Sequence, residues 1–92
     1  MILDTIIDLQ NRGFTFDFNL LGDRLFCTQT KSFFNSDQFD IIEIYSLDND
    51  YEPNNETVVY AIECFSDPVK GILFDNHNHV SLLFSKIKKF WR

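Results

Sequence analysis

The sequence predicts an α+β fold, a mostly antiparallel five-stranded meander sheet flanked by an N-terminal and a C-terminal helix. Apolar residues recur at helical spacing at both ends of the chain, and between them they alternate with polar residues as in strands. Short turn segments join the alternating runs, which favours antiparallel pairing because parallel crossovers need about a dozen residues. The 92 residues, of which 45% are hydrophobic, are expected to form one small domain over residues 1–92.

The first half of the chain predicts a helix, a hairpin and a loop. One side of the N-terminal helical repeat carries Ile2, Leu3, Ile6 and Ile7. Gly13 follows where a helix commonly ends. Residues 14–20 alternate as a strand, and the Gly22-Asp23 turn leads to a second strand at residues 25–28. The polar stretch 30–38 is predicted to be a loop whose Phe33 and Phe34 fix it to the body of the protein.

The second half predicts three strands and a helix. Residues 39–47 and 57–65 are the longest strand segments, and residues 69–75 follow the Ser66-Asp67-Pro68 turn. Ser81 is a suitable N-cap for a last helix, which would present to the sheet Leu82, Leu83, Ile87, Phe90 and Trp91. Both faces of the two long strands carry apolar side chains. We therefore expect the face that the helices leave open to be covered by a second copy, by the loop at 30–38 or by strong sheet curvature.

Charge is segregated along the chain, and the net charge is −6. No Lys or Arg lies between Lys31 and Lys70, whereas the last seven residues carry four cations and no acid. Nucleic acid is not expected as a partner, because phosphate binding needs a broad basic surface. No stretch approaches the roughly 20 apolar residues of a membrane span, and no signal peptide is recognisable, which predicts a cytoplasmic protein without a membrane partner. Cys27 and Cys64 are expected to be buried thiols.

Three segments carry a resemblance to a known family. They read GFTFDFNL, FDIIEIYSLDNDYEPNNETVVYAI and KGILFDNHNH. Over most of its length the chain resembles short bacterial proteins of about 100 residues that are labelled phosphoribosylpyrophosphate synthetase and whose function is not established. The family spacing recurs in Glu43-x-Tyr45, Pro53, Tyr60-Ala61-Ile62, Lys70-Gly71 and Asp75. The chain departs from the family pattern at Ser46, where an arginine is usual, and at Asn78, where a glycine is usual.

The synthetase activity that the family label implies is not supported by phosphate-binding motifs. Such an enzyme must hold ATP, Mg²⁺ and a sugar phosphate in a cradle of backbone amides and cations. The three glycines, Gly13, Gly22 and Gly71, form no phosphate-binding cluster. We therefore predict a non-enzymatic interaction module that binds a second copy or another protein. The alternative is a small-ligand-binding protein or an enzyme related to phosphoribosyl metabolism.

The polar residues of the long strands give the candidate binding site. Under that alternative, Glu43, Tyr45, Tyr60 and Glu63 are predicted to converge in a pocket on the sheet between the two helices. A Glu directed into an aromatic face would be a perturbed acid. The competing interpretation makes the two tyrosines core aromatics whose hydroxyls reach water. No catalytic residue and no cofactor is predicted.

Two segments carry side chains that could hold a cation. Counted from Asp48, the loop at residues 48–56 has Pro53 where an EF-hand requires glycine, and Val59 stands where it requires glutamate. A solvated hairpin loop is therefore expected, with weak divalent cation binding as the alternative. Asp75, His77 and His79 would form a transition-metal site only if the strand continued through them. The Asn-rich sequence around the two histidines favours a turn, and no metal site is predicted there.

Overall fold

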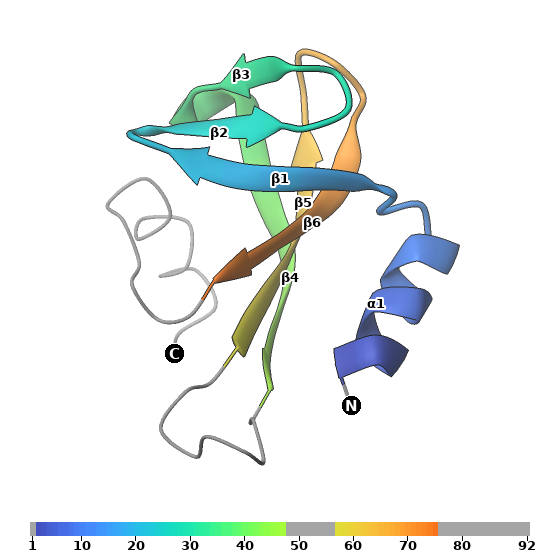
Figure 1. The fold of residues 1–92 in the computed structure, drawn as a ribbon. Helices are drawn as coiled ribbons and strands as arrows, with labels where there is room; N and C mark the ends of the chain where they lie inside the picture. The colour runs from blue at the N-terminus through green and yellow to red at the C-terminus, as the bar shows by residue number, and fades with distance from the viewer. Residues whose placement is uncertain (1, 48–56, 76–92) are drawn as a thin grey trace.

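The computed structural model describes residues 2–47 and 57–75, which form one helix, a short 3-10 helix and one six-stranded sheet (Figure 1). Helix α1 spans Ile2–Asn11 and the 3-10 helix η1 spans Ser36–Gln38. The strands are β1 (Phe16–Leu21), β2 (Arg24–Cys27), β3 (Ser32–Phe34), β4 (Phe39–Leu47), β5 (Thr57–Cys64) and β6 (Lys70–Asp75). The α+β class is therefore confirmed. The predicted C-terminal helix and the 48–56 loop lie outside the described residues.

The strand order corrects the predicted five-stranded antiparallel meander. The sheet is mixed and runs β3-β2-β1-β6-β5-β4. Every neighbouring pair is antiparallel except β1 and β6, which pair in parallel with Phe16 opposite Gly71. The sixth strand, β3, lies within the predicted loop at 30–38. Alternation identifies a strand but not its neighbour. The pairing of β6 with β1 joins the β4–β6 meander to the β1–β3 meander in one sheet.

The sheet is strongly coiled, and β1–β3 run across β4–β6 (Figure 1). All six strands contribute buried side chains to one cluster on the inner face. Within it the Phe18 and Phe34 rings meet edge to face at 6.4 Å between centroids. Three ways of covering the open face were expected, and the described residues show the third, strong sheet curvature. Phe34, which was predicted to lie in a loop, is buried inside the curved sheet. Phe33 instead points outward and is exposed.

Helix α1 covers part of the outer face of the sheet. Leu9 and Phe14 pack there in a second buried cluster, whose sheet side is formed by Val59, Ala61 and Ile72. The helix ends at Asn11, and the chain turns away at Gly13, whose φ of 102° is accessible to glycine at little cost. Phe14 then donates its backbone N–H to the Leu9 carbonyl. Among the described residues no helix has the length and apolarity to cross a membrane.

A β-bulge in β4 decides which side chains face the helix. Ile41 pairs with Ile62 and Glu43 pairs with Ala61, so Ile42 is an extra residue without a partner of its own on β5. Strict alternation would put Ile41, Glu43 and Tyr45 on one face. The extra residue shifts the phase, so that Ile41 stays in the inner core while Glu43 and Tyr45 face outward toward α1. The bulge thus places Ile41 and Ile44 on the inner face and Tyr45 on the outer face, although strict alternation would put Ile41 and Tyr45 on the same face.

Candidate functional site

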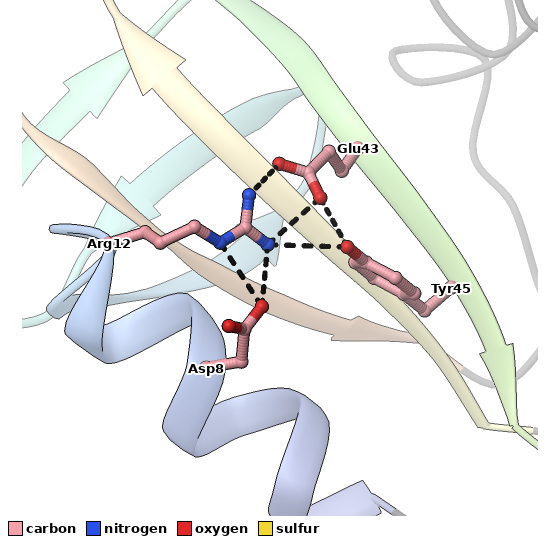
Figure 2. A network of polar contacts seen from close by, with 4 residues as sticks. All are labelled: Asp8, Arg12, Glu43 and Tyr45. Atoms are coloured by element: carbon pink, nitrogen blue, oxygen red, sulfur yellow. Dashed lines mark hydrogen bonds and ion pairs between the residues drawn. The ribbon is translucent and has the colours of Figure 1, made fainter.

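A polar network joins the end of α1 to strand β4, and four side chains form it: Asp8, Arg12, Glu43 and Tyr45 (Figure 2). Arg12 is the first residue after α1, and its backbone N–H still donates to the Asp8 carbonyl, 3.1 Å away. The Asp8 and Arg12 side chains are one helical turn apart, and Arg12 Nη2 lies 2.9 Å from Asp8 Oδ2. The carboxylate of Asp8 thus orients the guanidinium toward β4.

Glu43 receives the guanidinium through both of its oxygens. Arg12 Nη1 donates to Glu43 Oε2 at 2.5 Å and Nη2 donates to Oε1 at 2.9 Å. This two-point geometry suits the planar fork of arginine and a carboxylate. The hydrogen bond from Arg12 lowers the pKa of Glu43 below its ordinary value of 4.5 and is the largest cause of the shift. The hydrogen bond from Tyr45 lowers this pKa further. The Glu43 carboxylate is therefore held in its ionised form.

Tyr45 completes the network from the next outward-facing position of β4 after Glu43. Its hydroxyl donates to Glu43 Oε1 and lies 3.3 Å from Arg12 Nη2, which donates to it. The hydrogen bond to Glu43, followed by burial, raises the pKa of Tyr45. The tyrosine ring packs against the cluster beneath α1. Its hydroxyl thus stays protonated and serves as a donor.

The chemistry of the network is that of a clamp between helix and sheet. An ionised, hydrogen-bonded Glu43 is a weak proton acceptor, because taking a proton would break its bonds to Arg12. Hydrogen bonds to Glu43 and Tyr45 also raise the pKa of Arg12, with Glu43 the larger cause. The lowered pKa of Glu43 is opposite to the perturbation expected for a Glu buried in an aromatic face. The network thus favours charged Arg12, charged Glu43 and neutral Tyr45.

Tyr60 does not belong to this site. It pairs with Ile44 on β4 and Leu73 on β6, which places it on the inner face, and only 1% of its surface is exposed. Burial, followed by the charge of Asp75, raises the pKa of its hydroxyl. The prediction that Tyr60 shares a face with Glu43 and Tyr45 is therefore wrong. The interpretation of a core aromatic fits Tyr60, while Tyr45 is the half-buried partner of an ion pair.

Glu63 faces outward but lines a different feature, a half-open pocket of about 300 Å³ at the β5–β6 turn. The pocket is lined by Glu63, Cys64, Phe65, Pro68 and Lys70. Glu63 lies directly opposite Lys70 on β6 and Asp40 on β4. The sequence therefore predicted two of the network residues and one residue of the pocket.

Arg12 was missed in the sequence, although a signal for it exists. Asp8 and Arg12 stand four residues apart, which is the spacing of an ion pair along one flank of a helix. That flank is at the border of the apolar stripe and so faces a neighbouring strand. Which strand, and which acid on it, depended on the bulge at Ile42, and an extra unpaired residue leaves no mark in the hydrophobic pattern.

Neither cation site gains support in the part of the chain that the structure describes. Within residues 2–47 and 57–75 no cluster of three or more His, Cys, Asp or Glu side chains is placed to hold a metal ion. Asp75 ends β6. Its two predicted companions, His77 and His79, and the acidic loop at 48–56 lie outside the described residues.

A third feature, the aromatic patch, lies on the outer face of β1–β3, which runs beyond the part of the sheet that α1 covers. It consists of Leu21, Arg24, Phe26 and Phe33. The Phe26 and Phe33 rings pack at 4.9 Å between centroids, and the Arg24 guanidinium lies 4.2 Å from the centre of the Phe33 ring. Leu21 is 49% exposed and Phe33 is 43% exposed.

A scan against protein-family models, a search of curated proteins and a search of solved structures each found no match.

Proposed function

We propose that this protein is a non-enzymatic module that binds another protein through the aromatic patch. The observation that carries the proposal is the exposure of large apolar side chains on a rigid sheet surface. Phe33 is fixed between Phe26 and Arg24, so little side-chain entropy is lost when a partner covers it. The acids and tyrosine that a catalytic site would need at Glu43 and Tyr45 are bound in the clamp.

The surroundings of the aromatic patch have the organisation of a protein interface. Aromatic residues and arginine are enriched at the centres of interfaces, and polar residues form the rim. Next to the patch, Asn19 Nδ2 donates to Thr28 Oγ1 at 3.2 Å, and Gln29 Nε2 donates to Asp17 Oδ2 at 2.9 Å. These paired polar groups are already satisfied, and they supply a rim that need not be reorganised on binding.

Charge favours a different protein over a second copy. The chain carries a net charge of −6, and its pI is about 4.6. Two copies that meet through the same patch would bring like net charges together, whereas a basic protein would be attracted and steered toward the surface. We therefore assign the patch to a partner with an apolar centre and a basic surround.

Selection from a library of random peptides displayed on phage tests the proposal. The immobilised protein is expected to enrich peptides that combine aromatic and basic residues, and synthetic copies should bind in the micromolar range. Phe33→Ser should weaken their binding by about tenfold or more, as for a central interface residue. Phe74→Ser is the matched control, because Phe74 is a β-strand phenylalanine that is 49% exposed on the same outer face.

Three results would contradict the proposal. One is the absence of enriched peptides, another is equal loss of binding in the Phe33 and Phe74 variants. The third is a dimeric mass in light scattering that Phe33→Ser converts to a monomeric mass, which would assign the patch to a second copy. The amide spectra of both variants should match the parent protein, so that lost binding is not mistaken for lost folding.

A further inference from the structure

The pocket at the β5–β6 turn, here called the turn pocket, has preformed walls. Cys64 donates its N–H to the Val69 carbonyl at 2.9 Å and Phe65 donates its N–H to the Gln38 carbonyl at 2.8 Å, so the turn is tied to itself and to η1. Phe65 is 59% exposed, and with Pro68 it supplies the apolar wall. The volume of about 300 Å³ is at the lower limit of small-molecule sites and suits one long side chain.

Among the residues that the structure describes, the charges near the turn pocket are mostly negative. Glu63 lines it and lies directly across the sheet from Asp40, and like charges in opposite positions repel each other. Burial, Cys27, Asp67 and Glu63 raise the pKa of the Cys64 thiol to about 12, with burial the largest cause. Asp67 and Glu63 are thus both close enough to Cys64, one of the lining residues, to raise the pKa of its thiol. A cation beside Glu63 would be attracted by these carboxylates.

Lys70, the one cation among the described lining residues, is directed toward the end of α1. Its Nζ lies 4.5 Å from the centre of the Phe14 ring, in a cation–π contact. Lys70 and Glu63 face each other across the strands, but the ring contact gives the ammonium a partner of its own. The lining therefore keeps a carboxylate and an exposed aromatic ring for a ligand.

We propose that the turn pocket binds an arginine side chain of the partner protein. A guanidinium stacks on an exposed aromatic ring and pairs with a carboxylate through its planar fork, which matches Phe65 and Glu63. The methylene stem of the arginine would lie against Pro68. A free amino acid fits less well, because its own carboxylate would enter the field of Asp40, Glu63 and Asp67. The inference rests on the proposed function, since the pocket supplies an acidic contact for the basic partner, which the aromatic patch itself lacks.

Titration of the labelled protein with N-acetyl-arginine methylamide, followed by amide NMR, tests this site. This probe has no charged ends, so only the guanidinium is recognised. We expect shifts at residues 63–70 and a dissociation constant in the millimolar range, as for a ligand of this size. Glu63→Gln should weaken binding at least about fivefold, because it removes a charge-assisted pair. Asp23→Asn removes an exposed acid at the β1–β2 turn, which is not part of the lining, and should leave the constant unchanged.

The matched ligand is N-acetyl-citrulline methylamide, which has nearly the same shape without the charge. Equal binding of both compounds, or arginine shifts that persist in Glu63→Gln, would overturn the proposal. Phe65→Leu keeps an apolar wall and removes the ring, and it should bind the probe more weakly if stacking contributes. Stronger binding of N-acetyl-glutamate methylamide than of the arginine probe would instead assign the pocket to anions through Lys70.

The outcomes separate this inference from the proposed function. If selected peptides bind and depend on Phe33 but the arginine probe does not bind at residues 63–70, the pocket assignment fails and the interaction module stands. If the probe binds with the expected dependence on Glu63 but no peptide depends on Phe33, the pocket stands as an arginine site and the aromatic patch is not the interface.

Discussion

Arg12 links helix α1 to strand β4 through its side chain. Its guanidinium contacts Asp8 within the helix and Glu43 across the sheet. Exposed ion pairs contribute little to stability when they stand alone. Here the two-point geometry and the additional donor from Tyr45 make Glu43 the acceptor of three hydrogen bonds. The measurable effect at the residue scale should therefore come from the Glu43 carboxylate.

Glu43→Gln is expected to lower the free energy of unfolding by about 1 kcal/mol at pH 7, because a charge-assisted acceptor becomes a neutral amide in a partly exposed site. The folded state lowers the pKa of Glu43 from its ordinary value of 4.5. The unfolded chain therefore binds the proton first, and the stabilisation is complete above about pH 4.5 and is lost as the pH falls through the lower folded pKa. Urea unfolding at several pH values measures the difference between parent and variant.

The control for this experiment is Asp37→Asn, which removes a carboxylate from an exposed position on η1. Other carboxylates also titrate below pH 5, so only the difference between the parent and Glu43→Gln isolates the network. A difference that stays constant from neutral pH to pH 3, or one that grows on acidification, would show that Glu43 does not contribute as an ion.

At the residue scale the sequence predicted the right pair for a partly wrong reason. Glu43 and Tyr45 are two residues apart on a strand and were expected on one face, where the structure places them. Tyr60 was added because simple alternation across β4 and β5 allowed it. The bulge changes the phase between the first and second half of β4, and no residue type signals it, since Ile42 is as good a strand residue as its neighbours.

At the scale of elements, the bulge in β4 makes a distinctive prediction about deletions. Removing Ile42 leaves Ile41, Glu43, Ile44 and Tyr45 in regular alternation with their present faces, so the fold should persist with a loss of roughly 1–2 kcal/mol from altered twist. Removing Ile44 would turn Tyr45 toward the inner core and should abolish cooperative unfolding. Circular dichroism with urea titration compares the two deletions.

Ile44→Ala is the control for lost side-chain volume, because it removes most of the partly buried Ile44 without moving Tyr45. It should be clearly more stable than the Ile44 deletion. Equal damage from the two single-residue deletions would mean that the phase shift at Ile42 is not what sets the two faces of β4.

Gly71 is the residue that permits the parallel pair between β1 and β6. A Cβ atom at this position would lie 2.3 Å from the Phe16 carbonyl oxygen and 2.6 Å from Phe18 Cε2. Backbone cannot yield as a flexible side chain would, so Gly71→Ala should lose at least about 3 kcal/mol or fail to fold. Thermal unfolding should show little change for Gly22→Asn, where space is open and asparagine tolerates the φ of 62°. A folded, equally stable Gly71→Ala variant would contradict the register.

The helices and strands that could be predicted from the sequence are those whose apolar residues keep one regular spacing along the element. The helix at the N-terminus, both long strands and the strand after the Asp67-Pro68 turn appear where the pattern indicates them. The short strand β3 was not predicted, because its alternation extends over only three residues, with Phe33 outside and Phe34 inside. The parallel pairing of β1 and β6 is a tertiary choice that local periodicity does not contain.

At the scale of the molecule, both thiols report on the integrity of the inner core. Cys27 and Cys64 are free and buried in the same cluster. Because burial raises the pKa of Cys64 to about 12, the folded protein offers almost no thiolate there at pH 8. A chromogenic disulfide reagent should modify Cys64 only as fast as the core opens, and urea near the unfolding midpoint should accelerate the reaction strongly.

A Cys27→Ala variant isolates Cys64 for this measurement and leaves one small gap in the core. Rapid modification of Cys64 in this variant under native conditions, at the rate of an unfolded peptide, would contradict the burial of the thiol. The same assay on Gly71→Ala should give a rate near that of the unfolded chain, which links the local clash at β1–β6 to the opening of the entire core.

The parallel pair of β1 and β6 has a consequence for how the chain folds during its synthesis. Phe16 and Gly71 are neighbours in space but 55 residues apart in sequence (71 − 16). Closing so long a loop is slow, and the contact order of such a sheet is high. While the chain is being made, Phe18 and the hairpin β1–β2 have no β6 to pair with, since β6 ends at Asp75. The nascent chain must therefore carry the aromatic strands β1–β3 without their partner β6 until residue 75 has left the ribosome, which makes this stage the one most exposed to aggregation.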